Sequence, residues 1–200
     1  WQPYRLRLLV ACGAAAGMAA AYNAPVSGAV FAAQIVLGNF SMNLFAPLLF
    51  SSVVATMVSR SFFGIAPWYQ VPSFDFTRVT QLPWFVLLGI LCGILGAVFL
   101  KSLRRAEHWF SRIPAPMFIR MALGGLLVGL IAIRFPQVWG NGYAATNQIL
   151  QERPELIIIL GLFIAKLVAT AATAGSGAVG GIFTPTLFLG AALGSLFGVG

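Results

Sequence analysis

The chain has 200 residues, of which 60% are hydrophobic and only 8% are charged, and its formal net charge is +8. This composition leaves too little polar surface to cover a water-soluble globule, so we expect an integral membrane protein. The basic residues lie at the ends of apolar segments, where they contact lipid headgroups, and this arrangement argues against nucleic-acid binding.

Three apolar segments are predicted in the first third of the chain. The first, at about 8–22, is dense in Ala and Gly, which favours close packing between helices. The second, at 25–37, follows the sequence YNA and opens with a proline. It is too short to span a bilayer, because a span needs about 20 residues. The third runs from about residue 44 to residue 58 and ends at Arg60.

The rest of the chain alternates polar connections with longer apolar runs. The connection PWYQVPSFDFTRVTQ, at 67–81, is interpreted as a solvent-exposed linker. An apolar helix is then predicted from residue 82 into a basic segment, followed by helices at about 117–133, 156–173 and 182–199. Several segments are short or interrupted by Gly and Pro. Irregular backbone is tolerated in lipid only where protein buries it or where it lines a cavity, so this pattern indicates an ion or substrate site.

The sequence GSGAVGGIFTPTLFLG, at 175–190, has the features of a helix that begins inside the bilayer. If SGAVGG is a non-helical turn, the first amides of the next helix lack acceptors and carry a partial positive charge, which attracts an anion. Pro185 suits the first helical turn, and Gly180 and Gly181 leave the backbone open to a ligand. The motif holds no Lys or Arg, so it would bind an anion weakly enough to release it. The alternative interpretation is that the glycines serve only a tight turn and close packing.

Two stretches of the chain resemble the CLC chloride channel and transporter family. The run Gly181, Ile182, Phe183, Thr184 and Pro185 matches the G-x-F-x-P anion-binding signature of the family. The sequence GAAAGMAAAYNAPVSGAVFAAQIVLG, at 13–38, is similar to the pair of helices that follows the family's gating-glutamate loop. Because the two motifs occur in the same order as in the family, together they indicate it more specifically than either motif alone.

The resemblance implies an all-α integral membrane protein with the CLC-type inverted-repeat fold of short, broken and tilted helices. It also implies a multi-pass protein of the cell membrane that forms a homodimer. On this interpretation residues 1–65 hold the last helices of the first repeat and residues 66–82 form the linker between repeats. Residues 83–200 then hold the first helices of the second repeat, including the anion-binding helix N-terminus.

The resemblance further implies selective transport of chloride or a similar small inorganic anion. Gly181, Ile182 and Phe183 would bind the anion through the main chain, and Gly180, Thr184 and Pro185 would support the site. Ser176 lies in a turn that is similar to a family anion-binding turn, but it precedes a different helix and is not assigned as a ligand. The family's gating glutamate and its serine and tyrosine anion ligands match no residue of these 200.

Gln34 and Ile35 match positions that are commonly acidic in the family, and Ile35 matches the proton-transfer glutamate of its exchangers. Isoleucine carries no proton, which favours a voltage-gated-type channel. Some exchangers lack that acid, so a chloride/proton exchanger stays open. The four acids of the chain fall in polar connections or at helix ends, and they offer no proton relay through the bilayer: Asp75, Glu107, Glu152 and Glu155.

The remaining chemically notable residues are interpreted as structural. Lys166, inside a predicted span, is able to attract anions, but a structural role is favoured, in which its long stem reaches a membrane interface or its ammonium group binds a helix C-terminal carbonyl. His108 is expected in solvent and Cys12 and Cys92 as inert buried thiols, and four aromatic residues are expected at the membrane interface: Trp68, Tyr69, Trp84 and Trp109.

The predicted spans contain no acid and no His, so the sequence predicts neither an enzyme nor a metal or cofactor site. The alternative function is a broken-helix secondary transporter of an organic anion. The volume of the cavity in front of Ile182 would separate the two, because an organic substrate needs several hundred Å³.

Overall fold

The computed structural model describes residues 2–66, 69–71, 79–152 and 154–198, apart from the side chain of Met42. All regular secondary structure in these residues is helical, and the chain divides into two compact units, 1–68 and 69–200. Most of the predicted linker, including Trp68 and Asp75, lies outside the described residues. The division into inverted repeats stays a prediction.

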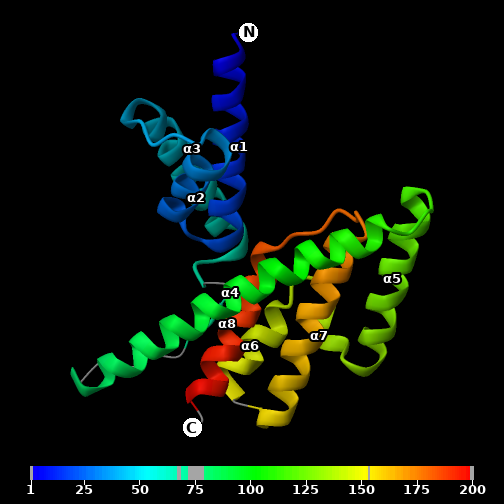
Figure 1. Cartoon of the computed structure of the whole chain (residues 1–200). Helices are drawn as coiled ribbons and strands as arrows, with labels where there is room; N and C mark the ends of the chain where they lie inside the picture. The colour runs from blue at the N-terminus through cyan, green and yellow to red at the C-terminus, as the bar shows by residue number, and fades with distance from the viewer. Residues whose placement is uncertain (1, 67–68, 72–78, 153, 199–200) are drawn as a thin grey trace. The chain divides into compact units, whose positions relative to one another are not determined.

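The first unit packs three helices, α1 (Pro3–Tyr22), α2 (Pro25–Ala32) and α3 (Met42–Phe63), with a five-residue π-helix, η1 (Ala33–Leu37), that continues α2 (Figure 1). Its core consists mainly of alanine, because alanine lets helix backbones approach closely. At Gly28 a Cβ atom would lie only 2.7 Å from the carbonyl oxygen of Ala15. The predicted close packing of the first segment is confirmed at this contact.

The turn between α1 and α2 is built around Asn23. Asn23 ends α1 in the left-handed conformation, with φ of 55°, which asparagine tolerates better than most residues. Its side-chain Nδ2 donates to the Ile65 carbonyl at 2.9 Å, and its Oδ1 accepts from Arg60 Nε at 2.6 Å. Pro25 then occupies the first turn of α2, where a missing N–H costs nothing.

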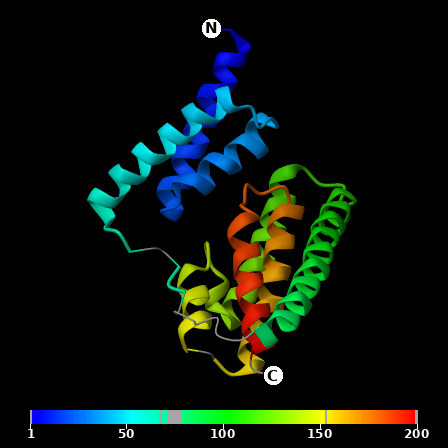
Figure 2. The same ribbon diagram turned by 90° about the vertical axis from the view of Figure 1, so that its left-hand side faces the viewer.

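The second unit holds the short helices η2 (Val79–Gln81) and η3 (Pro136–Val138) and five α-helices. These are α4 (Leu82–Ser111), α5 (Met117–Arg134), α6 (Tyr143–Glu152), α7 (Leu156–Gly175) and α8 (Phe183–Gly198). Helix α7 packs against α4, α5 and α8, and α6 packs against α8 (Figures 1 and 2). The core between them includes Phe99, Ile149, Ile159 and Phe188.

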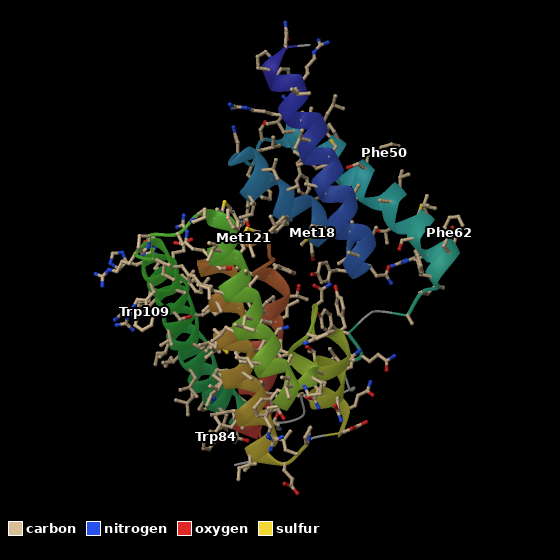
Figure 3. All side chains as sticks on the ribbon, turned by 90° about the vertical axis from the view of Figure 1, so that its right-hand side faces the viewer. Met18, Phe50, Phe62, Trp84, Trp109 and Met121 are labelled. Atoms are coloured by element: carbon tan, nitrogen blue, oxygen red, sulfur yellow. The ribbon has the colours of Figure 1, made fainter. Side chains whose placement is uncertain are left out.

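Four helical segments among the described residues are long and apolar enough to cross a membrane: 43–63, 79–111, α5 and α7. The apolar segments 25–37 and α8 are shorter. Trp84 and Trp109 are exposed at opposite ends of α4 (Figure 3). At about 1.5 Å per residue they are separated by about 37 Å along the helix axis, a length sufficient for one indole to reach each interface of a bilayer whose hydrocarbon core is about 30 Å thick. The structure thus fits the predicted role of these residues as interfacial anchors.

Candidate anion-binding site

The helix break predicted between two apolar segments is present. Helix α7 ends at Gly175, residues 176–182 are not helical, and α8 begins at Phe183. The Thr186 amide donates to the Ile182 carbonyl at 3.2 Å, which starts the hydrogen-bond ladder of α8. Pro185 lies in the first turn of this helix and is buried, as is Thr184.

The break leaves backbone donors at the start of α8. Within the described part of the chain, the amides of Gly181 and Ile182 have no hydrogen-bond partner. The side chains of Ile182 and Phe183 are 48% and 41% exposed, so neighbouring residues of this chain do not bury the segment. An N–H without a protein acceptor at a helix start is a preformed site for a negative charge.

Close backbone contacts fix the position of this turn. A Cβ atom at Gly175 would lie 2.7 Å from the carbonyl carbon of Ala106 in α4. One at Gly124 in α5 would lie 2.5 Å from the Ser176 side chain. The Ser176 hydroxyl is itself buried and donates to the Thr173 carbonyl at 2.9 Å, which agrees with leaving Ser176 out of the ligand set.

Lys166 on α7 has hydrogen-bond partners that suit a structural role, and they correspond to one of the two structural alternatives that the sequence left open. The residue is 3% exposed, and its Nζ donates to the carbonyls of Val138 and Gly140 at 2.9 Å each. Val138 is the last residue of η3, so the lysine binds a helix C-terminal carbonyl. The ammonium group also lies 5.8 Å from the centre of the Phe188 ring. Through these contacts Lys166 ties α7 to the segment 138–140, which precedes α6, and to α8.

A cleft of about 550 Å³ lies beside the α7–α8 turn. Gly180, Gly181 and Pro185 line it together with Lys166 and the turn residue Asn141. Ile182 is not among the lining residues, so this volume does not measure the space in front of the Ile182 amide. Sequence reasoning missed the contribution of the WGNG turn, although Gly140 and Gly142, which have positive φ, mark it as a sharp bend.

Gln34 and Ile35 lie in the π-helix η1 of the first unit, and both are exposed. The apolar segment predicted at 25–37 is helical over its whole length, but its last five residues have π geometry and are followed by Gly38, with φ of 65°. Glu107, Glu152 and Glu155 are exposed, and so is His108, as predicted. Both cysteines are free, but Cys92 in α4 is exposed, so the prediction that it is buried is wrong. The residues described include no cluster of side chains able to hold a metal ion.

Comparison with known proteins gives consistent matches. The family model "Voltage gated chloride channel" matches residues 2–200. A ClcB-like chloride channel protein of Ralstonia nicotianae is 48% identical over 195 residues, which are 98% of this chain and 46% of the relative. The voltage-gated ClC-type chloride channel ClcB of Escherichia coli O9:H4 is 40% identical over 193 residues, 96% of this chain and 46% of the relative.

A solved structure supports the same assignment. The crystal structure of a slow cyanobacterial Cl⁻/H⁺ antiporter matches with a TM-score of 0.79 and 28% identity, over 91% of this chain and 44% of that one. The predicted fold class, an all-α integral membrane protein of the CLC type, is confirmed by this match. The chain spans about half the length of the curated relatives that it matches. From its sequence and its fold, the chain belongs to the voltage-gated chloride channel family.

Proposed function

We propose that the protein containing this chain transports chloride, or a similar small inorganic anion, across the cell membrane. The main-chain N–H groups of Gly181, Ile182 and Phe183 bind the dehydrated anion, and Gly180, Thr184 and Pro185 support the turn that presents them. The observation that carries the proposal is the break between α7 and α8, which leaves the Ile182 amide without an acceptor in the described chain. Family membership supports the choice of ion.

The mechanism rests on backbone dipoles in a setting of low dielectric. A dehydrated anion loses hydration free energy, and oriented amides at the start of α8 offset part of that loss. No cation lies in the turn 176–182, so the anion is held weakly enough to leave. The proposed site therefore needs neither a metal nor a prosthetic group. The working unit is proposed to be a homodimer, as is typical of the family.

Removing a single N–H tests the site directly. Replacement of Ile182 by the corresponding hydroxy acid exchanges its N–H for an ester oxygen and keeps the side chain. The full-length protein with this ester, reconstituted in liposomes, is expected to lose most of its chloride efflux. The matched control is the same exchange at Ala178, which lies in the same turn but outside the G-x-F-x-P signature. If the Ile182 ester and the Ala178 ester gave equal chloride efflux, the assignment of the Ile182 N–H as an anion ligand would be contradicted.

A side-chain variant gives a second test. A Cβ atom at Gly181 would meet nothing within 4 Å in this chain, and the residue does not have a positive φ. Gly181→Ala is therefore expected to fold normally while it narrows the approach to the amides and lowers chloride flux. An organic-anion transporter would instead show no chloride-dependent efflux in the unmodified protein, and this result would contradict the proposed ion.

A further inference from the structure

The last turns of α4 carry a group of exposed basic side chains. No ion pair joins any of them to an acid within the described parts of the chain: Lys101, Arg104, Arg105, His108 and Arg112. The acid in the same segment, Glu107, is exposed as well. Figure 3 shows side-chain nitrogen atoms gathered around the end of α4 that carries Trp109. These basic groups are therefore available to an anion from outside the chain.

The basic side chains form a single stripe on α4, which we call the basic stripe. At about 100° per residue they all fall within an arc of about 100°, because residues three, four, seven and eleven positions apart return to the same side of a helix. The buried Phe99, and Ala106, which lies against Gly175 of α7, point to the opposite side of α4. The basic stripe thus faces away from the core of the second unit.

The same side of α4 is apolar just before the basic stripe begins. Four residues, each at least 41% exposed, have spacings that place them on this side: Leu87, Ile90, Ile94 and Val98. From Leu87 to Val98 the helix rises about 16 Å, close to one leaflet of a hydrocarbon core about 30 Å thick. Lys101 follows about 4.5 Å beyond Val98. The outward side of α4 therefore pairs an apolar part, as long as the acyl chains of one leaflet, with a basic part directly beyond it.

Trp109 indicates the depth at which the basic stripe lies. Its side chain flanks the stripe and is 77% exposed. An exposed indole on a membrane helix prefers the headgroup layer, where its ring is in contact with lipid and its N–H with polar groups. A helix surface that faced only water would not need this indole or the apolar run before the stripe. The anions nearest to the basic stripe are therefore the phosphates of lipids.

We propose that the basic stripe of α4 binds the headgroup of an anionic phospholipid, whose acyl chains lie along the apolar part of the same side. The stripe recognises the phosphate and the net negative charge of the headgroup, because guanidinium groups bind phosphate oxygens through two N–H donors and attract anionic lipid at longer range. A zwitterionic phospholipid has the same phosphate, but its own cation offsets the charge. This lipid site is separate from the α7–α8 turn and does not depend on the proposed function.

The test compares two lipids that differ only in the headgroup. Full-length protein in neutral detergent is titrated with dioleoyl phosphatidylglycerol or dioleoyl phosphatidylcholine, and native mass spectrometry counts the bound lipids. One Lys or Arg near an anionic surface strengthens the attraction by about fivefold, so the anionic lipid is expected to bind at least about fivefold more tightly. The triple variant Lys101→Gln, Arg105→Gln and Arg112→Gln is expected to weaken its binding by at least about tenfold and to leave the zwitterionic lipid unaffected.

Two control variants separate the stripe from overall charge. Arg5→Gln, Arg7→Gln and Arg134→Gln together remove the same charge from exposed residues outside the stripe. Exchanging arginine and lysine at the three stripe positions keeps the charge in place. Both controls are expected to bind phosphatidylglycerol as tightly as the unmodified protein. If the charge-matched control and the neutralised stripe bound it equally, the lipid site would be overturned.

A second measurement uses the unmodified protein and so does not depend on the folding of a variant. The chain holds two lysines, and Lys166 is 3% exposed, so Lys101 is the accessible lysine of this chain. Phosphatidylglycerol is expected to protect Lys101 from acetylation by an amine-reactive ester, read from the mass of its peptide, and phosphatidylcholine is not. Equal acetylation of Lys101 in the two lipids would overturn the proposal. Protection by inorganic phosphate without lipid would also overturn it, because the ligand would then be a soluble anion.

Discussion

Gly175→Ala is expected to destabilise the packing that positions the anion-binding turn. The added Cβ would lie 2.7 Å from the carbonyl carbon and the Cβ of Ala106, and 2.9 Å from its carbonyl oxygen, whereas ordinary contacts begin at 3.4 Å. Two of these three atoms belong to the backbone of α4, so no side-chain rotation relieves the clash. Helix α7 or α4 has to move by roughly 0.7 Å or more, and overpacking of this kind costs about 1–3 kcal/mol.

The helix propensity of alanine offsets only part of this cost. Alanine is favoured over glycine by at most about 1 kcal/mol inside a helix, and by less at Gly175, the last residue of α7. A net loss of about 1–2 kcal/mol remains, which lowers the ratio of folded to unfolded protein by about fivefold to thirtyfold. Because residues 176–182 follow directly, the displacement is also expected to reduce anion flux.

The measurement is equilibrium unfolding of the purified full-length protein in detergent. Gly93→Ala is the matched control, since Gly93 lies in α4 and its added Cβ would meet nothing within 4 Å in this chain. Gly93→Ala is expected to be neutral or more stable, by at most about 1 kcal/mol. If Gly175→Ala were as stable as Gly93→Ala, the contact between α4 and α7 would not be as close as described here.

Three further predictions concern other parts of the molecule. Lys166→Met is expected to lower the free energy of unfolding by about 2–4 kcal/mol in the same assay, because two carbonyls lose their donor; an unchanged value would contradict the structural role. Asn23→Ala should cost about 1–2 kcal/mol, since alanine disfavours the left-handed conformation and lacks the side-chain hydrogen bonds; Asn23→Gly, which keeps the backbone freedom, should cost less. Because Ile35 carries no proton, a pH gradient is expected to leave the chloride reversal potential unchanged, and a shift would identify an exchanger.

The positions of the helices could be predicted from apolar length, but their ends could not. Helix α1 begins at Pro3, several residues before the apolar run at 8–22, because Arg5 and Arg7 are good helix formers outside the hydrophobic segment. A hydropathy pattern measures the part of a helix that lipid covers. For the same reason hydropathy does not reveal η3 and α6, which lie in the polar stretch between α5 and α7.

The break at the start of α8 could be predicted because Gly and Pro act locally. Gly177 has φ of 82°, and Pro185 occupies a first-turn position, so the local chemistry alone ends one helix and begins the next. The cleft could not be predicted, because Lys166 and Asn141 meet only through tertiary packing. From the sequence, the ammonium group of Lys166 was compatible with attracting anions and with binding backbone carbonyls. Only the positions of the Val138 and Gly140 carbonyls in the fold distinguish these two roles.

Two helix ends in the second unit show how one physical rule serves structure and transport. At the C-terminus of η3 the unpaired carbonyls are partially negative, and the covalently attached cation of Lys166 satisfies them. At the N-terminus of α8 the amides are partially positive, and no acid of the chain lies nearby in sequence. A tethered partner is always present at high effective concentration, so it fixes the structure but cannot be exchanged. The amides of Gly181 and Ile182, just before α8, have no partner among the described residues and are open to a mobile ion of opposite sign. This difference makes the turn before α8, and not the end of η3, the candidate transport site.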